Sequence, residues 1–158
     1  MGQLLRSLIP WGTEAIVWVQ SFRSGFLDVF FQGVTFLGEE NFYLLFLPLI
    51  YWCVDKRVGI GLAYISLSSI YLNSVLKPIF RIPRPSDPRI AVLWEANDPS
   101  FPSGHAQNAV ANWGLLATQF RRRAFVALVA LLILLIAFSR LYLGVHYPQD
   151  LMGGLLVG

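Results

Sequence analysis

Long apolar segments with almost no charge constrain this chain more than any other feature. Residues 58–76 carry no charged side chain, residues 104–120 hold His105 as their single ionisable group, and residues 124–138 are apolar throughout. A helix needs about 20 mostly apolar residues to cross the hydrocarbon core of a bilayer. These three segments therefore predict membrane-spanning helices.

Two shorter segments extend this pattern toward the N-terminus. Residues 24–38 are apolar apart from Asp28 and Gln32, and residues 41–54 are apolar but short and contain Pro48. We expect both segments to form further helices of the same membrane-embedded bundle.

The two ends of the chain differ from these segments. Residues 11–22 mix Trp, Ile and Val with Glu14 and Gln20, which is typical of a helix that lies in the membrane interface. The last segment begins at Pro148 and the sequence stops at Gly158, which is too short for a full span. We therefore predict an all-α, polytopic transmembrane helix bundle of about six spans, the last of them truncated, with an interfacial N-terminal helix. Residues 1–158 are expected to form one membrane-embedded domain.

The composition excludes several other classes of protein. The chain is 56% hydrophobic and 13% charged, whereas soluble domains average about 45–50% apolar and about 25% charged residues. Disordered, collagen-like and coiled-coil chains are excluded by these values. A disulfide scaffold is excluded because Cys53 is the only cysteine. The basic pI of about 9.3 comes without a continuous basic face, so we expect no nucleic-acid partner.

The basic residues in the predicted loops indicate how the chain is oriented in the membrane. By the positive-inside rule, the loops that carry most of the Lys and Arg face the cytoplasm. We therefore expect the Pro-rich loop over residues 80–102 to face the extracytoplasmic side of a plasma (inner) membrane. The basic residues assigned to the cytoplasmic loops are Arg6, Arg23, Lys56, Arg57, Arg121, Arg122 and Arg123.

Eight residues suited to anion chemistry lie at or beside the predicted span ends. Because successive spans alternate in direction, all eight positions meet at one membrane face. An ionisable group near hydrocarbon costs at least about 2.5–3.5 kcal/mol, which makes it a functional candidate. The eight are Lys77, Arg84, Ser103, Gly104, His105, Arg140, His146 and Asp150.

Three of these residues are cations that match a phosphate dianion. Lys77, Arg84 and Arg140 can neutralise charge spread over three oxygens, and Arg supplies planar, bidentate donors. Ser103 and Gly104 open a predicted helix, where a hydroxyl and free backbone N–H groups favour an anion and glycine allows close approach. We therefore predict that these five residues bind a phosphate group.

The remaining three residues suggest catalysis. The chain has two histidines, and both belong to this set, so one ring can attack phosphorus while the other protonates the leaving oxygen. Asp150 can accept a ring N–H from His146 and so fix its tautomer. Pro148 suits the first turn of a helix that begins after His146. The neighbouring cations would repel a divalent ion, so we expect no metal and no cofactor.

These motifs together resemble a known family. Lys77 with Arg84-Pro85, then Pro102-Ser103-Gly104-His105, then Ser139-Arg140 with His146 and Asp150, is similar to the three-part signature of the type 2 phosphatidic acid phosphatase superfamily. The resemblance implies a membrane core of usually six helices and a phosphohistidine intermediate. It also implies that His146 is the nucleophile, Asp150 its orienting partner and His105 the acid for the leaving group. Hydrolysis of a lipid phosphate within the membrane is the expected activity.

Other interpretations remain open from the sequence. Similar motifs occur in vanadium haloperoxidases, and charged span ends would also suit a non-catalytic anion transporter or channel. Phosphatidic acid, phosphatidylglycerol phosphate, undecaprenyl pyrophosphate, a sphingoid phosphate and a sugar phosphate all fit as substrates, and the sequence does not fix the oligomeric state. Five further polar residues at helical spacing are interpreted as interhelical hydrogen bonds and not as ligands. They are Ser66, Ser69, Asn73, Asn108 and Asn112.

Overall fold

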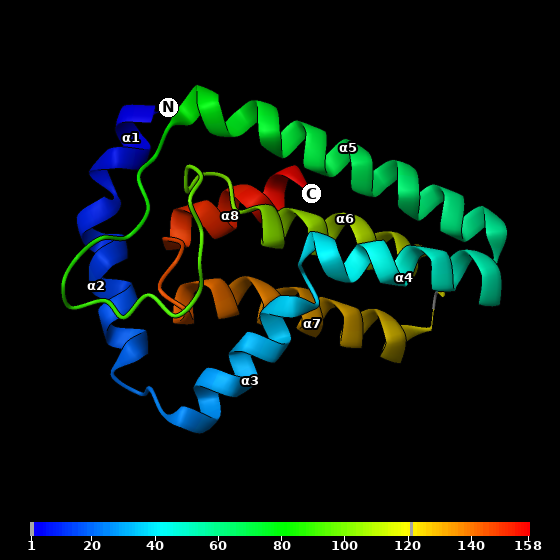
Figure 1. Cartoon of the computed structure of the whole chain (residues 1–158), viewed down its shortest axis with the longest axis horizontal. Coiled ribbons are helices and arrows are strands. Elements are labelled where there is room, and N and C mark those ends of the chain that lie inside the picture. The colour runs from blue at the N-terminus through cyan, green and yellow to red at the C-terminus, as the bar shows by residue number, and fades with distance from the viewer. Residues whose placement is uncertain (1, 121) are drawn as a thin grey trace.

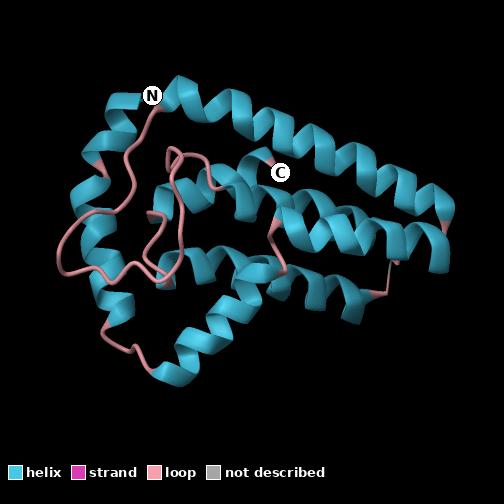
Figure 2. Cartoon of the chain, viewed as in Figure 1, coloured by secondary structure: helices cyan, strands magenta, loops and turns pink. Residues whose placement is uncertain are grey.

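The structure is a computed structural model that describes residues 2–120 and 122–158, so Arg121 of the predicted cytoplasmic run lies outside the described residues. Within the described residues all regular structure is helical, as predicted (Figure 2). The helices are α1 (Gly2–Ser7), α2 (Ile9–Gln20), α3 (Gly25–Phe36), α4 (Glu40–Cys53), α5 (Lys56–Phe80), α6 (Gly104–Gln119), α7 (Arg123–Tyr142) and α8 (Pro148–Val157).

Helices α4 to α8 run roughly along the long axis of the molecule, and α1 and α2 cross one end of it (Figure 1). The C-terminal ends of α5 and α7 and the N-terminal ends of α6 and α8 gather beside α1 and α2. We call this end the site end, because all eight candidate residues lie there. The predicted meeting of alternate span ends is therefore confirmed.

Two helices within the described residues are long and apolar enough to span a membrane, α5 and α7. Helix α6 has only 16 residues, and it buries Gln107, Asn108 and Asn112. These polar side chains make α6 less apolar than α5 and α7, although its segment was also predicted to span the membrane. Its buried amides need hydrogen-bond partners inside the bundle.

Helix α5 supplies those partners. Ser66 bonds to Asn112, the Ser69 hydroxyl donates to Asn108 over 2.7 Å, and the Asn73 amide donates to Gln107 over 2.8 Å. The interhelical role predicted for these serines and asparagines is confirmed. The bonds fix α5 against α6, and thereby fix Lys77 relative to His105.

Local sequence explains where α5 begins and ends. The Asp55 carboxylate accepts from the backbone N–H groups of Arg57 and Val58 at 2.7 and 3.0 Å, which is a helix N-cap. At the other end Arg81 has a φ of 47°, and Pro83 follows it. The chain therefore leaves the helix one turn after Lys77 and enters the Pro-rich loop.

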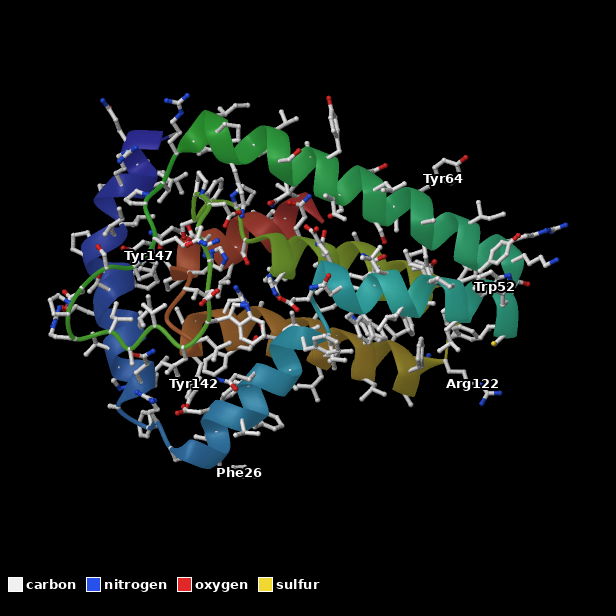
Figure 3. All side chains as sticks on the ribbon, viewed as in Figure 1. Phe26, Trp52, Tyr64, Arg122, Tyr142 and Tyr147 are labelled. Carbon is white, nitrogen blue, oxygen red and sulfur yellow. The ribbon has the colours of Figure 1, made fainter. Side chains whose placement is uncertain are left out.

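Large apolar side chains project away from the bundle (Figure 3). Phe26, Trp52 and Tyr64 are 78, 75 and 72% exposed. So much exposed aromatic surface is unusual for a soluble monomer, but it is what lipid-facing helices require. This surface agrees with a protein embedded in a membrane.

Helix α2 is the predicted interfacial helix, although it begins two residues before the predicted segment. Ile16 and Val19 are buried in the core, whereas Trp11 and Trp18 are 58 and 66% exposed. The short helix α1 extends it (Figure 1). An exposed aromatic face on a helix across the bundle end suits the interface between lipid and water.

The predicted separation of Arg6 and Arg23 from the Pro-rich loop, on opposite faces of the membrane, is wrong. The Arg6 guanidinium donates to the Arg81 carbonyl over 2.8 Å, and Arg23 pairs with Asp28, which also accepts from the Tyr142 hydroxyl. Both arginines therefore lie at the site end, together with the Pro-rich loop. The error arose because α1 and α2 cross the bundle end instead of spanning.

The Pro-rich loop is irregular, as predicted, and it is fixed by specific contacts. The Gln20 side chain bonds both backbone polar groups of Ala91 at 2.8 and 2.9 Å, and the Leu93 N–H donates to Leu143 over 3.0 Å. Gly144 has a φ of 71°, and a Cβ there would lie 2.7 Å from the Ala91 carbonyl oxygen. The glycine thus lets the turn after α7 approach the loop.

Candidate active site

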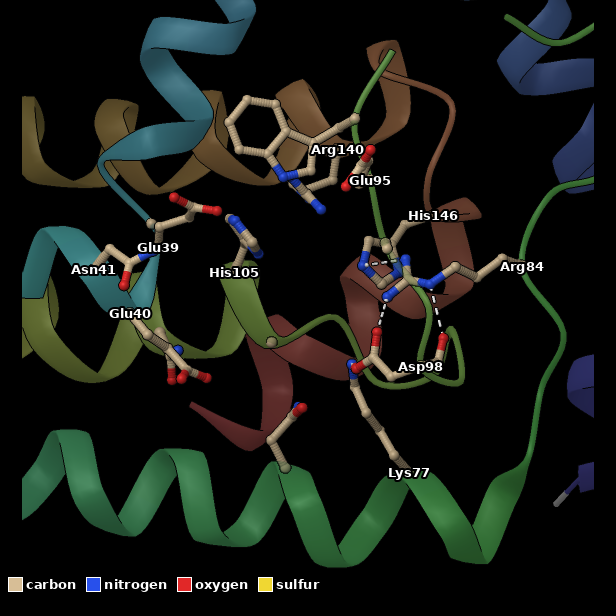
Figure 4. Close-up of a pocket in the computed structure, with 16 residues that line it drawn as sticks. Glu39, Glu40, Asn41, Lys77, Arg84, Glu95, Asp98, His105, Arg140 and His146 are labelled. Atoms are coloured by element: carbon tan, nitrogen blue, oxygen red, sulfur yellow. Dashed lines mark hydrogen bonds and ion pairs between the residues drawn. The ribbon is translucent and has the colours of Figure 1, made fainter. Parts of the chain in front are cut away.

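A cavity of about 300 Å³ lies at the site end, between the Pro-rich loop and the ends of α5, α6 and α7. Six of the eight candidate residues line it: Lys77, Arg84, Gly104, His105, Arg140 and His146. Figure 4 shows both imidazole rings, Arg140 and Lys77 approaching this space from different elements. The structure therefore brings three separate stretches of sequence to one site.

Lys77 and Arg84 share a carboxylate at the cavity wall. Asp98 of the Pro-rich loop pairs with Lys77 and accepts from the Arg84 Nη2 over 2.5 Å (Figure 4). Burial raises the pKa of Asp98, but the hydrogen bonds from the two cations outweigh it and hold the pKa below its ordinary value. The carboxylate is thus ionised, and any anion that enters the cavity must compete with it for both cations.

Two side chains hold Arg140 in position, Thr35 through a hydrogen bond and Trp94 through its ring face. Arg140 is 1% exposed, its Nη1 donates to the Thr35 hydroxyl over 2.9 Å, and its guanidinium carbon lies 5.9 Å from the centre of the Trp94 ring. A cation over an indole face at this distance is stabilised by the ring quadrupole. Its Nε is buried without a partner, which leaves donor capacity for an anion in the cavity.

His105 begins the first turn of α6, and its ring faces the cavity. Its Nε2 is buried without a hydrogen-bond partner among the described residues. A buried polar atom without a partner is costly, and this one is in position to meet a ligand atom. The ring is free to exchange a proton with whatever occupies the cavity.

His146 lies in the turn before α8, with both ring nitrogens in polar contact. Its Nε2 lies 3.2 Å from the Arg84 Nη1, and its Nδ1 lies 3.3 Å from the Ser100 hydroxyl oxygen. Burial, with the charges of Arg84 and Arg140, holds the pKa of His146 well below its ordinary value. The ring is therefore neutral, as a nucleophile requires.

Asp150 lies in the first turn of α8, and Pro148 opens that helix, as predicted. The carboxylate is fully buried. One oxygen accepts from the Tyr147 N–H over 2.8 Å and from the Ser100 hydroxyl. It lies 3.5 Å from the His146 Nδ1, which is longer than the predicted direct hydrogen bond.

Ser103 and Gly104 differ in their relation to the cavity. Gly104 lines it, and a Cβ there would lie 3.2 Å from the Asn73 side-chain oxygen. Ser103 occupies the N-cap position of α6, but its hydroxyl makes no capping bond and is buried without a partner. Its backbone N–H donates to the Asp150 carbonyl over 3.0 Å, which joins the starts of α6 and α8.

Several residues of the site escaped the sequence analysis. Asp98 and Ser100 pair with candidate residues, Thr35 and Trp94 hold Arg140, and Glu39 lines the cavity. No spacing within the Pro-rich loop distinguishes Asp98 from its other acids. These contacts depend on tertiary structure alone.

Within residues 2–120 and 122–158, no group of three His, Cys, Asp or Glu side chains is arranged to hold a metal ion. Three cations and two imidazoles line the cavity together with four carboxylates, those of Glu39, Glu40, Glu95 and Asp98. The cations and rings can bind an anion, and Asp98 occupies Lys77 and Arg84 in the absence of one.

An anion site built from cations and histidines at the ends of membrane helices defines the class of this protein. Residues 58–158 match the PAP2 superfamily. The chain belongs to this superfamily of phosphatases, and the resemblance seen in the three motifs is confirmed.

Curated relatives agree with this assignment. The chain is 31% identical to the lipid phosphate phosphatase delta of Arabidopsis thaliana, over 97% of this chain and 43% of that protein. It is 34% identical to a probable sphingosine-1-phosphate phosphatase of Dictyostelium discoideum, over 90% and 38%, and 32% identical to human sphingosine-1-phosphate phosphatase 2, over 91% and 38%. The chain thus spans about two fifths of the length of these relatives.

Solved structures show the same fold. The structure of Aquifex aeolicus LpxE matches with a TM-score of 0.82 and 27% identity, over 91% of this chain and 87% of that one. A transmembrane PAP2-type phosphatidylglycerolphosphate phosphatase from Bacillus subtilis matches with a TM-score of 0.79 and 24% identity, over 94% and 79%. The chain is therefore a membrane protein with a helical PAP2 fold.

Proposed function

We propose that this chain is a metal-independent phosphatase that hydrolyses a lipid phosphate monoester through a phosphohistidine intermediate. The observation that carries the proposal is the single cavity lined by Lys77, Arg84, Arg140 and both histidines. Cations on several sides of a small space suit the charge of a phosphate better than any neutral ligand.

The cations would hold the phosphate for in-line attack. Lys77 and Arg84 contact it from the loop side in place of Asp98, and Arg140 contacts it from α7. The Gly104 N–H at the start of α6 adds a donor on the positive end of the helix dipole. Donors fixed before the reaction stabilise the charge that develops on the phosphoryl oxygens.

The first chemical step transfers the phosphoryl group to His146. Its Nε2 lone pair forms a bond to phosphorus while the bond from phosphorus to the lipid oxygen breaks. His105, on the other side of the cavity (Figure 4), begins as an imidazolium that the bound phosphate dianion stabilises, and it gives its proton to the leaving oxygen. The lipid alcohol departs, and the ring of His146 carries the phosphoryl group and a proton on Nδ1.

Water completes the cycle. His105 takes a proton from a water molecule, the water oxygen bonds to phosphorus, and the phosphorus–nitrogen bond breaks. Inorganic phosphate leaves and both rings return to their starting state. The net reaction is ester plus water to alcohol plus phosphate, and no oxidant or metal is required.

Among lipid phosphates, the rim of the cavity favours one that carries an amine. Glu39, Glu40 and Glu95 line the cavity together with the cations, and none of these carboxylates forms an ion pair within the described residues. A sphingoid base phosphate has an ammonium group close to its phosphate, whereas phosphatidic acid has none. The names of the sphingosine-1-phosphate phosphatase relatives also support this substrate class.

Phosphate release by the purified protein in detergent, with EDTA present, tests the proposal. We expect release from a sphingoid base 1-phosphate, and slower release from phosphatidic acid and from the N-acylated ceramide 1-phosphate, which lacks the ammonium group. Equal rates on all three lipids would refute the amine preference alone. Absence of release from every lipid, or release that requires an added divalent ion, would refute the proposed activity.

We also propose that the site end faces the extracytoplasmic side of the membrane. Lys56, Arg57, Arg122 and Arg123 lie at the opposite end of the bundle, and no ion pair joins them to an acid within the described residues. At the site end, Arg23, Arg84 and Arg89 pair with acids. Among the described arginines there, only Arg6, Arg81 and the cavity-lining Arg140 are without an ion pair. Unpaired basic residues next to span ends favour the cytoplasm.

A thiol-labelling experiment on intact cells tests this orientation. Native Cys53 is exposed at the end of α4 that lies away from the cavity, and Val92 of the Pro-rich loop is 56% exposed. An impermeant maleimide is expected to label Val92→Cys in a Cys53→Ser background, and to leave the native chain unlabelled until the cells are lysed. The reverse pattern would place the site end in the cytoplasm.

A further inference from the structure

His146 and Asp150 are not joined directly. The distance from Nδ1 to the Asp150 carboxylate is 3.5 Å, longer than the 3.3 Å from Nδ1 to the Ser100 hydroxyl oxygen, and both exceed the usual 2.7–3.2 Å of an N–H···O hydrogen bond. The same carboxylate oxygen already accepts from the Tyr147 N–H at 2.8 Å and from the Ser100 hydroxyl. The orienting influence of Asp150 must therefore reach the ring by another route.

Ser100 supplies that route. Its hydroxyl oxygen lies 3.3 Å from Nδ1, nearer than the carboxylate, and it also bonds to Asp150. A carboxylate can only accept, so the serine hydroxyl must donate its single hydrogen to Asp150. Its lone pairs then remain to accept a hydrogen from Nδ1. Hydrogen bonds of this kind are often long in the absence of substrate and shorten with substrate bound.

The other side of the ring indicates the same tautomer. The His146 Nε2 lies 3.2 Å from the Arg84 Nη1, and a guanidinium can only donate. Nε2 must therefore accept, which places the ring proton on Nδ1. Two contacts from different parts of the Pro-rich loop thus agree that Nε2 is the unprotonated nitrogen, and its lone pair accepts from Arg84 until that guanidinium turns to a bound anion.

We propose that Ser100 is a positioning residue that links Asp150 to His146 and keeps the nucleophilic nitrogen unprotonated. The inference rests on the proposed function, because it assigns the attacking atom of the same site. Ser100 is fully buried and does not line the cavity, so it acts through His146 and not on substrate. Its backbone N–H donates to the Ile82 carbonyl over 2.8 Å, which fixes its position independently of its side chain.

The link also matters after attack. Once Nε2 bonds to phosphorus, the ring carries a proton on Nδ1 and a positive charge. Ser100 passes a hydrogen bond from that proton to the buried Asp150 carboxylate, which stabilises the charge. Without the hydroxyl, only the Arg84 contact still favours the proton on Nδ1, so the Nε2–H form, which has no lone pair to attack with, becomes more populated.

Nitrogen NMR of the ring measures the tautomer directly. The chain has two histidines, so the variant His105→Gln, labelled with ¹⁵N-histidine, reports His146 alone. In this background we expect the shifts of an Nδ1–H ring. Adding Ser100→Ala is expected to move them toward the Nε2–H form, whereas the control Ser66→Ala, another buried serine in a hydrogen bond, leaves them unchanged. Unchanged shifts in Ser100→Ala would overturn the proposal.

Kinetics in the otherwise native chain gives the second measurement. Mutation of a group that orients a reacting side chain typically lowers activity about 10- to 100-fold. We therefore expect Ser100→Ala to lower kcat by that factor and to keep KM within about twofold of the native value. Ser100→Thr, which keeps the hydroxyl, is expected to recover most of kcat. A fall in kcat of less than about twofold for Ser100→Ala would contradict the role. If the native chain hydrolyses no lipid phosphate, the proposed function fails, while the NMR result still decides the tautomer.

Discussion

Replacement of His146 by alanine is expected to reduce phosphate release by at least about 10⁴-fold, since loss of a nucleophile removes the covalent route altogether. The ring is nearly fully buried, at 1% exposure, and it contacts the cavity beside Arg84. The measurement is initial rate with a sphingoid base phosphate in detergent, with the melting temperature recorded to confirm folding. Substantial activity in His146→Ala would exclude the phosphohistidine route.

His105→Ala is the matched comparison, because His105 is proposed to act as the acid and not as the nucleophile. Its loss is expected to matter least for an aryl phosphate, whose leaving group needs little protonation. We therefore expect an activated aryl phosphate to recover the first step in His105→Ala, measured as a rapid single-turnover release of the aryl alcohol, and to recover nothing in His146→Ala. Equal rescue of both variants would refute the division of roles between the rings.

Arg140→Ala is expected to lower kcat by about 10²–10³-fold, the usual effect of removing one donor that stabilises transition-state charge. Arg140→Lys is expected to recover only part of this loss, because an ammonium lacks the planar guanidinium fork and stacks poorly on Trp94. The measurement is kcat and KM with the same lipid. Because Arg140 is buried against Thr35, thermal unfolding separates a loss of fold from a loss of catalysis.

Arg89→Ala serves as the control for general electrostatics at the site end. Arg89 is an exposed arginine that pairs with Asp87 and Glu14 and does not line the cavity. Exposed ion pairs contribute little to stability. The rate of Arg89→Ala is therefore expected to stay within about twofold of the native rate. If Arg140→Ala kept more than a tenth of the native rate, Arg140 would not be a direct phosphate ligand.

The motifs in the sequence located the site well because the chemistry uses residues that are costly in a membrane. Lys77 and Arg140 stand out against the apolar helices around them, and the two histidines are the only ones in the chain. Alternation of helix direction then sufficed to bring these positions to one end. The structure confirms that meeting, while the individual catalytic roles remain to be tested.

The N-terminal part was predicted less well. The sequence suggested an interfacial helix, which α2 confirms, but the positive-inside argument placed Arg6 and Arg23 on the opposite face from the Pro-rich loop, whereas they lie at the same end. Loop charges indicate orientation only when each helix between them crosses the membrane. Helices α1 and α2 cross the bundle end (Figure 1), and hydropathy alone does not distinguish that arrangement from a short span.

What the sequence by itself determined was the all-helical membrane fold, the helix ends that carry charge and six of the residues that line the cavity, since apolar length and isolated ionisable groups are local properties. Only the tertiary structure placed Asp98 between Lys77 and Arg84, and Ser100 between His146 and Asp150. Hydrogen bonds of this kind depend on positions within a few tenths of an ångström. Those positions are set by the packing of an irregular loop against helix ends, which has no period in the sequence.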